Sequence, residues 1–557
     1  MRARLSPALA LGGCLAIVML LFWWLWIGQR GFVSRDDSPA GAATMAEARA
    51  RASNPGRVAG SEVATEQFAG KNSAADDPAG LLRRRLEEKD ARANEAVLTF
   101  KSGEAYRNFL AKAARLGLRV RGRLDALRIV RVGYDSLDPL LGDILGNPAD
   151  YAGIDPNHLV RLPATPAAEN RPQVSQVALG NHTLEFLGVT GDHSQWGRGI
   201  SIAVLDTGVA SDVTLAGGRV RYLDVGMGIM PGLGLEDGHG TAVAGLAAGA
   251  SPDAPGVAPA ASILSIRVTD ADGMSDSFTL AQGIVAAVDA GARIINISMG
   301  SYAAAGVLSA AIEYAGSQGA LIVASAGNDG AAQLTWPAAD PRVVSVGAVD
   351  ALEQQVYFSN AGEQLKVTAP GYGIDAAWLD GSRVSFDGTS ASAPLVAGAI
   401  AAMMSVSPGL SATQAWGILQ QHVSDGGAPG ADADYGAGIL NVGWAMDRNN
   451  VARVDTAIAG EYYDATTGTM NVVVQNRGAQ SVGGLQLSVN IGGVSSTNVV
   501  PSLASGATFL FQAPITAQQI AANGGIVFRT RLTNPVGLVD QVPANNAKSG
   551  VIVPPVK

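Results

Sequence analysis

Cysteine is nearly absent from this chain of 557 residues. The single cysteine, Cys14, lies in an N-terminal apolar run, so the folded part has no disulfide bond, no thiol nucleophile and no cysteine metal site. The chain also lacks an excess of basic residues, because its formal net charge is −9, and this argues against a nucleic-acid partner. Only five histidines are present, so chemistry that uses an imidazole has few candidates.

Apolar residues make up 47 % of the chain and charged residues 16 %, a composition that allows a large buried core. The length leaves room for about two to four domains. Glycine is abundant, with 69 residues, which suits an α/β scaffold with tight turns and close backbone contacts.

An uncharged stretch at residues 8–28 follows two arginines near the N-terminus. As a helix it would be roughly 30 Å long, enough to cross a bilayer. It is longer than the apolar region of a typical cleaved signal peptide, and no small-residue cleavage site lies just after it. We therefore expect residues 1–30 to form an uncleaved membrane anchor, with a cleaved signal as the alternative. The rest of the chain would then lie outside the cytoplasm, either anchored or secreted.

Residues 31–92 are rich in Ala, Gly, Ser, Asp and Glu and predict a flexible linker, with a charged helix near its end. Residues 93–162 follow the order strand, helix, two strands, helix, strand, which predicts a small ferredoxin-like α+β domain. In the strand at 118–124 the apolar residues alternate with arginines, so Leu118, Val120 and Leu124 are predicted to share one face. The predicted strands are 96–100, 118–124, 127–134 and 158–162, and the predicted helices are 102–117 and 136–145.

Polar, proline-containing residues at 163–180 predict a linker. From 181 to 448 short apolar strands alternate with Ala-rich helices, which indicates a parallel sheet buried on both faces. Residues 452–557 instead show strands of period two separated by Gly, Asn, Ser and Pro, the pattern of a β-sandwich. The predicted fold class is therefore α/β, with a parallel sheet flanked by helices between a small α+β domain and a C-terminal β-sandwich.

Four polar residues follow apolar strands or begin helices of small residues. Asp206 follows a strand in "AVLDTGV", and Asn328 follows another in "ASAGNDG". His239 in "GHGTAVAGLAAG" and Ser390 in "DGTSASAP" each head a helix. Alone, each has an ordinary explanation as a turn former, a loop residue or a helix cap. Together they fall where open α/β sheets bind ligands, at the carboxyl ends of the strands.

Acyl-transfer chemistry needs these residue types. A serine hydroxyl becomes a nucleophile when an imidazole takes its proton, and a buried carboxylate fixes the tautomer of that imidazole. The oxyanion of the tetrahedral intermediate needs hydrogen-bond donors. The backbone N–H of Ser390 at a helix N-terminus and the side-chain amide of Asn328 can supply them.

These motifs resemble those of the subtilisin-like serine proteases: Asp-Thr-Gly, His-Gly-Thr-x-Val-Ala-Gly, Ala-Gly-Asn and Gly-Thr-Ser-x-Ser-Ala-Pro, in that order. The resemblance covers residues 181–448. It implies an endopeptidase in which Asp206 orients His239, His239 acts as general base and then acid, and Ser390 attacks the peptide bond. Asn328 and the backbone of Ser390 would form the oxyanion hole.

The resemblance also implies a substrate-binding cleft. Two segments, 298–301 and 324–327, would line the pocket for the side chain before the scissile bond and pair with a protein or peptide substrate as an added strand. Their small, uncharged residues indicate a preference for apolar or medium-sized side chains. The substrate-binding residues expected on this basis are Ser298, Met299, Gly300, Ser301, Ala326 and Gly327.

The region at 93–162 is similar in order and position to the inhibitory propeptide of these proteases. Residues 92–162 contain 11 basic and 8 acidic residues, whereas 181–448 contain 9 basic and 25 acidic ones. Opposite net charges favour docking of one on the other, although a solvated arginine face is the simpler alternative. We expect a zymogen that is cut within 163–180, where no residue identifies the bond.

The chemistry requires no cofactor. The family often binds structural calcium, but the acidic loops at 270–273 and 431–435 lack a complete ligand pattern, so no metal ligand is assigned. The C-terminal sandwich weakly resembles adhesion-type modules and transfers no site. The alternative functions are a catalytically inactive surface-binding or adhesion protein on a protease scaffold, and an esterase. An esterase would favour Gly-x-Ser-x-Gly, whose second glycine is Ser392 here.

Overall fold

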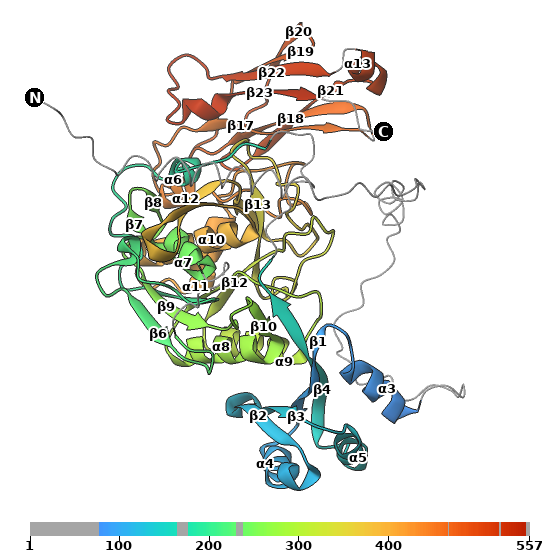
Figure 1. Cartoon of the computed structure of the whole chain (residues 1–557). Helices are drawn as coiled ribbons and strands as arrows, with labels where there is room; N and C mark the ends of the chain where they lie inside the picture. Colours follow the sequence, from blue (N-terminus) through green and yellow to red (C-terminus); the bar gives the residue numbers. More distant parts are fainter. Residues whose placement is uncertain (1–76, 164–175, 230–237, 466, 523–524, 553–557) are drawn as a thin grey trace, which may run out of the picture. The chain divides into compact units, whose positions relative to one another are not determined.

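The computed structural model describes residues 77–163, 176–229, 238–465, 467–522 and 525–552 (Figure 1). The predicted membrane anchor at residues 8–28 lies outside these residues, as do most of the two predicted linkers. Among the described helices, α10 (Thr389–Val406) is long and apolar enough to cross a membrane, but 83 % of its apolar window is buried inside the protein. It is therefore placed as a core helix.

The central sheet contains seven parallel strands in the order β14-β13-β12-β11-β5-β9-β6. Every residue of β11, β12, β13 and β14 is buried, as the continuous apolar runs predict. The fold class expected from the sequence is thus confirmed for this sheet. The strands are β5 (Ser201–Asp206), β6 (Val220–Leu223), β9 (Ser262–Arg267), β11 (Ile294–Ile297), β12 (Leu321–Ser325), β13 (Val344–Val349) and β14 (Val367–Pro370).

Helices cover both faces of this sheet (Figure 1). Ile202 and Val204 of β5 pack on the face covered by α7 and α10, whereas Ala203 and Leu205 pack on the face covered by α8 and α9. The small residues allow close helix packing, because a Cβ at Gly398 of α10 would lie 2.6 Å from the backbone oxygen of Ala247 in α7. The helices are α7 (His239–Ala248), α8 (Ser277–Asp289), α9 (Gly306–Ser317), α11 (Ala412–Gln420) and α12 (Val442–Met446).

The N-terminal α+β unit follows the predicted order of strands and helices after the helix α3 (Pro78–Leu86). Its sheet has the order β10-β4-β1-β3-β2 and includes the short strand β10 (Met274–Asp276), which comes from the following part of the chain. β1 and β4 start earlier than predicted because they pair with each other along most of their length. The elements are β1 (Ala91–Phe100), α4 (Gly103–Lys112), β2 (Arg119–Leu124), β3 (Ile129–Gly133), α5 (Asp138–Gly146) and β4 (Tyr151–Arg161).

The predicted face of β2 needs one correction. Leu118 and Leu124 are buried, but Val120 is 40 % exposed. The pairing of β2 with β3 shifts register between Val120 and Gly122, and such a bulge breaks the alternation of faces. Sequence alternation alone cannot show a bulge, because the extra residue is defined by its partner strand.

The sheet of the N-terminal unit is covered on both faces. Leu98 and Val130 pack with α4 and α5 on one face. Val97, Ile129 and Val160 belong instead to the cluster that contains the apolar residues of α8 and α9. The unit therefore packs against two helices of the central α/β region.

The C-terminal part folds into two antiparallel sheets, ordered β17-β18-β21 and β20-β19-β22-β23. Apolar residues from both sheets, among them Val472 and Leu487, form one cluster between them. The sequence indicates β18, β19, β21 and β22 by their alternation. The strands are β17 (Thr456–Asp464), β18 (Thr469–Asn476), β19 (Gln486–Ile491), β20 (Val494–Val499), β21 (Thr508–Pro514), β22 (Ile526–Thr533) and β23 (Ala547–Ile552), with a short helix α13 (Ala517–Ala522).

Candidate active site

Asp206 and His239 form a buried hydrogen-bonded pair at the carboxyl edge of the central sheet. Asp206 is the last residue of β5 and His239 the first residue of α7. The Nδ1 atom of His239 lies 2.8 Å from Oδ1 of Asp206, and the same oxygen accepts the backbone N–H of Thr207 at 2.8 Å. Both side chains are almost fully buried. The carboxylate therefore fixes the imidazole orientation.

Close packing around the pair requires glycine on the helix side. A Cβ at Gly240 would lie 2.3 Å from the backbone oxygen of Gly208. The N–H of Gly240 donates to Oγ1 of Thr207 at 3.0 Å, which holds the start of α7 against the end of β5. The His239 ring also packs against the Phe386 ring in a T-shaped arrangement, with ring centroids 5.2 Å apart. The histidine is thus held from two sides.

Ser390 lies in the first turn of α10, after Gly388, whose φ of 130° is a conformation that favours glycine. The Oγ atom of Ser390 donates to the backbone oxygen of Ser298 at 3.3 Å, and the Oγ atom of Ser298 donates to the backbone oxygen of Ser390 at 3.3 Å. These bonds join the nucleophile candidate to the end of β11. Among the described contacts, its hydroxyl is directed to Ser298 and not to His239.

Asn328 lies after β12 and is oriented by the residue that precedes Ser390. Its Oδ1 atom accepts the backbone N–H of Thr389 at 2.9 Å and the Thr389 hydroxyl at 2.8 Å. With the oxygen held in this way, the Nδ2 atom points toward Gly388, where a Cβ would lie only 2.8 Å from it. The amide N–H groups are therefore presented beside Ser390.

One cavity of about 140 Å³ brings these residues together. It contains His239, Asn328 and Ser390, as well as Pro163 at the end of the N-terminal unit. Four of the residues that the sequence indicates separately thus meet at one edge of the sheet, since Asp206 lies directly behind His239. The other lining residues are Trp378, Val384, Ser385, Phe386 and Asp387.

The end of β4 lies along one of the two segments expected to bind substrate, residues 298–301. The backbone of Arg161 exchanges two hydrogen bonds with Gly300, N to O at 3.1 Å and O to N at 3.0 Å. On its other edge β4 pairs with β10, with Arg161 opposite Met274. An extended chain is therefore already inserted between β10 and Gly300.

The six expected substrate-binding residues do not all face this cleft. Ser298 and Gly300 contact it through their backbones, as described above. The side chain of Met299 is fully buried in the apolar cluster with α8 and α9, and Ala326 packs against Leu334 and Leu365. Gly327 lies beside Asn360 and Thr335, and Ser301 pairs with Trp336 through backbone hydrogen bonds.

Comparison with known proteins agrees with this arrangement. A family model described as the subtilase family matches residues 197–438. The thermostable alkaline protease of Halalkalibacterium halodurans is 31 % identical over 307 residues, which are 54 % of this chain and 83 % of that protein. The chain belongs to the subtilase family. Subtilisin BL of Lederbergia lenta is 34 % identical over 252 residues, 44 % of this chain and 90 % of that protein.

A solved structure shows the same fold. Fervidolysin from Fervidobacterium pennivorans, a keratinolytic enzyme related to subtilisin, superposes with a TM-score of 0.55 at 20 % identity, over 84 % of this chain and 77 % of that chain. At that identity the similarity concerns the fold alone. The resemblance to subtilisin-like proteases and the subtilisin-like sheet are confirmed by these comparisons.

Three residues of this subtilase site are not among those that the sequence motifs indicate. Thr389 orients Asn328, and its place inside the Gly-Thr-Ser motif is the signal that would have indicated it. Phe386 and Trp378 come from the hairpin β15 (Ile374–Ala377) and β16 (Arg383–Phe386), with rings 6.2 Å apart. No local pattern links Phe386 to His239 or Trp378 to Phe386, because these contacts are formed by the fold.

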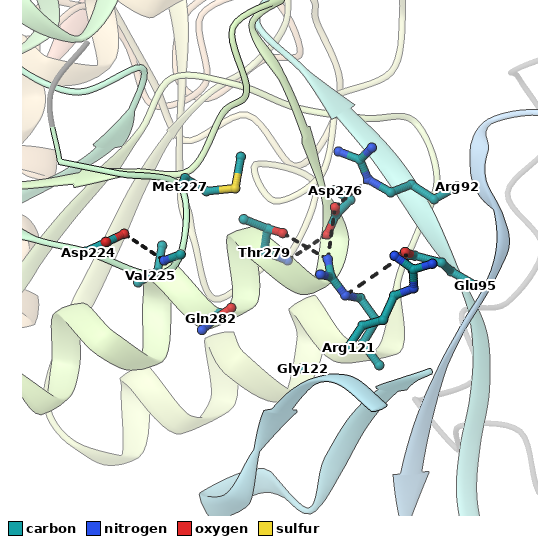
Figure 2. A pocket seen from close by; sticks show the side chains of 12 residues that line it. Arg92, Glu95, Arg121, Gly122, Asp224, Val225, Met227, Asp276, Thr279 and Gln282 are labelled. Carbon is teal, nitrogen blue, oxygen red and sulfur yellow. Dashed lines mark hydrogen bonds and ion pairs between the residues drawn. The ribbon is translucent and has the colours of Figure 1, made fainter. Parts of the chain in front are cut away.

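A second cavity, of about 630 Å³, lies where the N-terminal unit meets α8 (Figure 2). Arg92 and Arg131 both approach the buried carboxylate of Asp276, at 2.6 Å and 3.4 Å, and Arg121 lies 3.4 Å from Glu95. The cavity is thus lined by paired charges of both signs. The remaining lining residues are Gly122, Asp224, Val225, Gly226, Met227, Thr279 and Gln282.

The two acidic loops do not fit a calcium ion. Asp270 accepts the backbone N–H groups of Asp272 and Met274 at 3.0 Å each. Asp432 accepts those of Asp434 and Tyr435 at 2.9 and 2.7 Å. These carboxylates are used to form turns, and the described residues contain no group of three or more His, Cys, Asp or Glu that could hold a metal.

Proposed function

We propose that this subtilase is an active serine endopeptidase that uses Asp206, His239 and Ser390. The observation that carries the proposal is the buried 2.8 Å bond between Asp206 and His239 beside the one cavity that also contains Ser390 and Asn328. A scaffold without catalysis would have no need for all four residues.

The chemistry follows from these positions. With Nδ1 of His239 donating to Asp206, Nε2 is free to accept the hydroxyl proton of Ser390 once that hydroxyl turns from Ser298. Oγ then forms a bond to the substrate carbonyl carbon, and His239 returns the proton to the leaving nitrogen as the C–N bond breaks. Water, deprotonated by His239, hydrolyses the acyl-enzyme in the same way and restores the serine.

The Nδ2 group of Asn328 and the backbone N–H of Ser390 are proposed to bind the oxyanion. Removing one such donor typically lowers kcat about 100- to 1000-fold. Thr389 would act as a positioning residue, because it holds Oδ1 of Asn328 through two hydrogen bonds. The amide would then need no reorganisation during the reaction.

We further propose that the N-terminal unit is a propeptide and that the chain is exported as a zymogen. Asn157 of β4 is fully buried, and its Oδ1 accepts the N–H of Phe278 at 3.1 Å and the hydroxyl of Ser277 at 3.2 Å, at the start of α8. The inserted chain next to Gly300 would block substrate. The apolar stretch at 8–28 supports export and anchoring, which sequencing the N-terminus of the cellular protein tests.

A fluorophosphonate probe tests the catalytic proposal, because it labels only a serine activated by its surroundings. We expect the full chain, after its own processing, to be labelled, and Ser390→Ala to remove the label and the hydrolysis of peptides. Ser392→Ala is the matched control, since Ser392 lies on the same helix and donates instead to the backbone oxygens of Ala369 and Pro370. Labelling that persists in Ser390→Ala would contradict the proposal.

The second candidate is an inactive binding or adhesion protein, favoured only by the added C-terminal sandwich. It predicts no labelling of the wild type. An esterase would be labelled but would hydrolyse esters and leave matched amides intact, so comparing the two substrates separates all three functions.

A further inference from the structure

The chain inserted in the cleft shows which residue would lie next to the scissile bond. Arg161 is paired with Gly300 in an antiparallel bridge, and the N–H of Leu162 donates to the backbone oxygen of Gly273 at 3.4 Å. In antiparallel pairing, a residue two positions further along one strand faces the residue two positions back on the other. Pro163 therefore faces Ser298.

Pro163 also shares the cavity that contains Ser390. Proline has no backbone N–H, so it cannot donate to the backbone oxygen of Ser298, and this oxygen instead accepts the Ser390 hydroxyl. A peptide residue at this position would have its carbonyl carbon beside Oγ of Ser390. Pro163 thus marks the position of the residue whose peptide bond would be attacked.

The space for a side chain at this position is limited by Thr335. A Cβ at Gly300 would lie 2.4 Å from Oγ1 and 2.6 Å from Cβ of Thr335, and a Cβ at Gly327 would lie 3.0 Å from its Cγ2. Both glycines belong to the segments expected to wall the pocket. The side chain of Thr335, which is only 7 % exposed, therefore fills the space between the two walls.

Thr335 cannot easily move away. Its N–H and Oγ1 both donate to the backbone oxygen of Ala326, at 3.0 and 3.3 Å. The next residue, Trp336, exchanges two backbone hydrogen bonds with Ser301. The segment that carries Thr335 is joined to both walls, so a large substrate side chain could enter only by distorting this packing.

We infer that Thr335 fills the end of the pocket that receives the side chain of the residue preceding the scissile bond. This subtilase would therefore cut after small or compact residues such as alanine, serine or proline. The inference rests on the proposed function. It narrows the apolar or medium-sized preference expected from the sequence. Pro163 is the compact residue that the chain itself presents at this position, and alanine should be better than proline because its N–H can donate to Ser298.

Matched peptide amides that differ only in the residue before the cut test this inference on the processed enzyme. We expect kcat/KM to be at least about 10-fold higher for alanine than for phenylalanine. A single methylene group more or less in an apolar pocket changes kcat/KM about 10- to 200-fold. Thr335→Gly should raise kcat/KM for the phenylalanine peptide by a similar factor and should change kcat/KM for the alanine peptide little. Thr335→Val, which keeps the shape, should keep the selectivity, and Thr335→Ser should give an intermediate result.

A second test uses the full chain, in which Pro163 at the end of the N-terminal unit is the residue before the expected cut. Pro163→Phe should slow the release of the N-terminal unit, and combining it with Thr335→Gly should restore the rate, whereas Pro163→Ala should speed release. Restoration by Thr335→Gly would be unexpected if Pro163→Phe acted only by unfolding the unit. The readout is the rate at which the processed chain appears on a gel.

The outcomes separate the inference from the function on which it rests. An enzyme that is labelled by the fluorophosphonate probe but cuts as fast after phenylalanine as after alanine overturns the inference and leaves the protease assignment intact. A chain that is neither labelled nor active on any peptide overturns both. If Thr335→Gly fails to fold, the wild-type preference and Thr335→Ser still decide the matter.

Discussion

The N-terminal α+β unit and the C-terminal sandwich contact the same central region in different ways. The N-terminal unit contributes a backbone strand to the cleft, with Arg161 paired to Gly300, and its Asn157 accepts the N–H of Phe278 in the first turn of α8. The sandwich contacts the central region through side chains, such as Lys548 to Glu353 and Gln475 to the backbone N–H of Asp425 at 3.1 Å. Within the part of the chain that the structure describes, only the first of these two units reaches the cavity around Ser390.

For activity, the place where each unit contacts the central region therefore matters more than whether the contact uses backbone or side-chain atoms. Both units use buried or partly buried charge pairs, as Arg92 with Asp276 and Lys548 with Glu353 show. Such pairs join each unit to the central region, but a backbone strand in the cleft would, under the proposed function, also exclude substrate. We therefore expect the two units to differ in what their loss does: loss of the first changes activity, and loss of the second changes stability.

Deleting one unit at a time gives the largest expected contrast. Expression without residues 77–163 should yield little active enzyme, because the apolar face carried by α8 and α9 then lacks its cover during folding. Expression without 452–557 should yield enzyme that is still labelled by the fluorophosphonate probe but unfolds at a lower temperature. The measurement is the labelled fraction per mass of soluble protein, and equal yields from the two deletions would remove the distinction.

A smaller effect is expected from a single contact of the N-terminal unit. Asn157→Ala leaves the buried N–H of Phe278 without its acceptor, which typically costs about 1–3 kcal/mol, and also removes the hydrogen bond from Asn157 to Glu95. In the uncut Ser390→Ala chain, amide exchange in β1 and β4 should become faster. Asn147→Ala is the control, because this exposed asparagine bonds only within its own unit, to Asp143. Equal exchange rates in both variants would mean that the hydrogen bond between Asn157 and Phe278 does not help to hold the N-terminal unit on α8.

The sequence indicates the site better than the cleft around it. Asp206, His239, Asn328 and Ser390 each lie in a local motif at a strand end or helix start, and sheet topology then forces them to one edge. Thr335 carries no such signal, because its role depends on contact with two distant glycines.

The same reason explains the other differences in the fold. The exposed Val120 reflects a register shift that only the partner strand reveals. The polar strand β20 lacks an apolar alternation, since its residues are almost all exposed, and it is held by pairing with β19. Strands and helices that bury an apolar face could be predicted from the sequence. Features that depend on pairing with a neighbouring strand, such as the bulge in β2 and the exposed strand β20, could not.

The smallest effect concerns how the sandwich responds to pH. Burial, with a smaller contribution from the charge of Glu353, raises the pKa of Glu461 in β17 to about 7, although the hydrogen bond from Thr530 and the charge of Lys548 oppose this shift. The folded protein therefore holds this proton more tightly than the unfolded chain, whose pKa is near 4.5. Between these two values the free energy of unfolding should fall as pH rises, by up to about 1.4 kcal/mol per pH unit, and then level off above pH 7.

Glu461→Gln should remove this dependence, because the neutral amide resembles the protonated acid. In the Ser390→Ala chain, amide exchange in β17 and β22 should speed up between pH 5 and pH 8, after correction for the intrinsic rate, and the variant should show a smaller increase. The control is Glu363→Gln, an exposed glutamate outside the sandwich. If the wild type and Glu461→Gln respond equally to pH, protonation of Glu461 does not contribute to the stability of the sandwich.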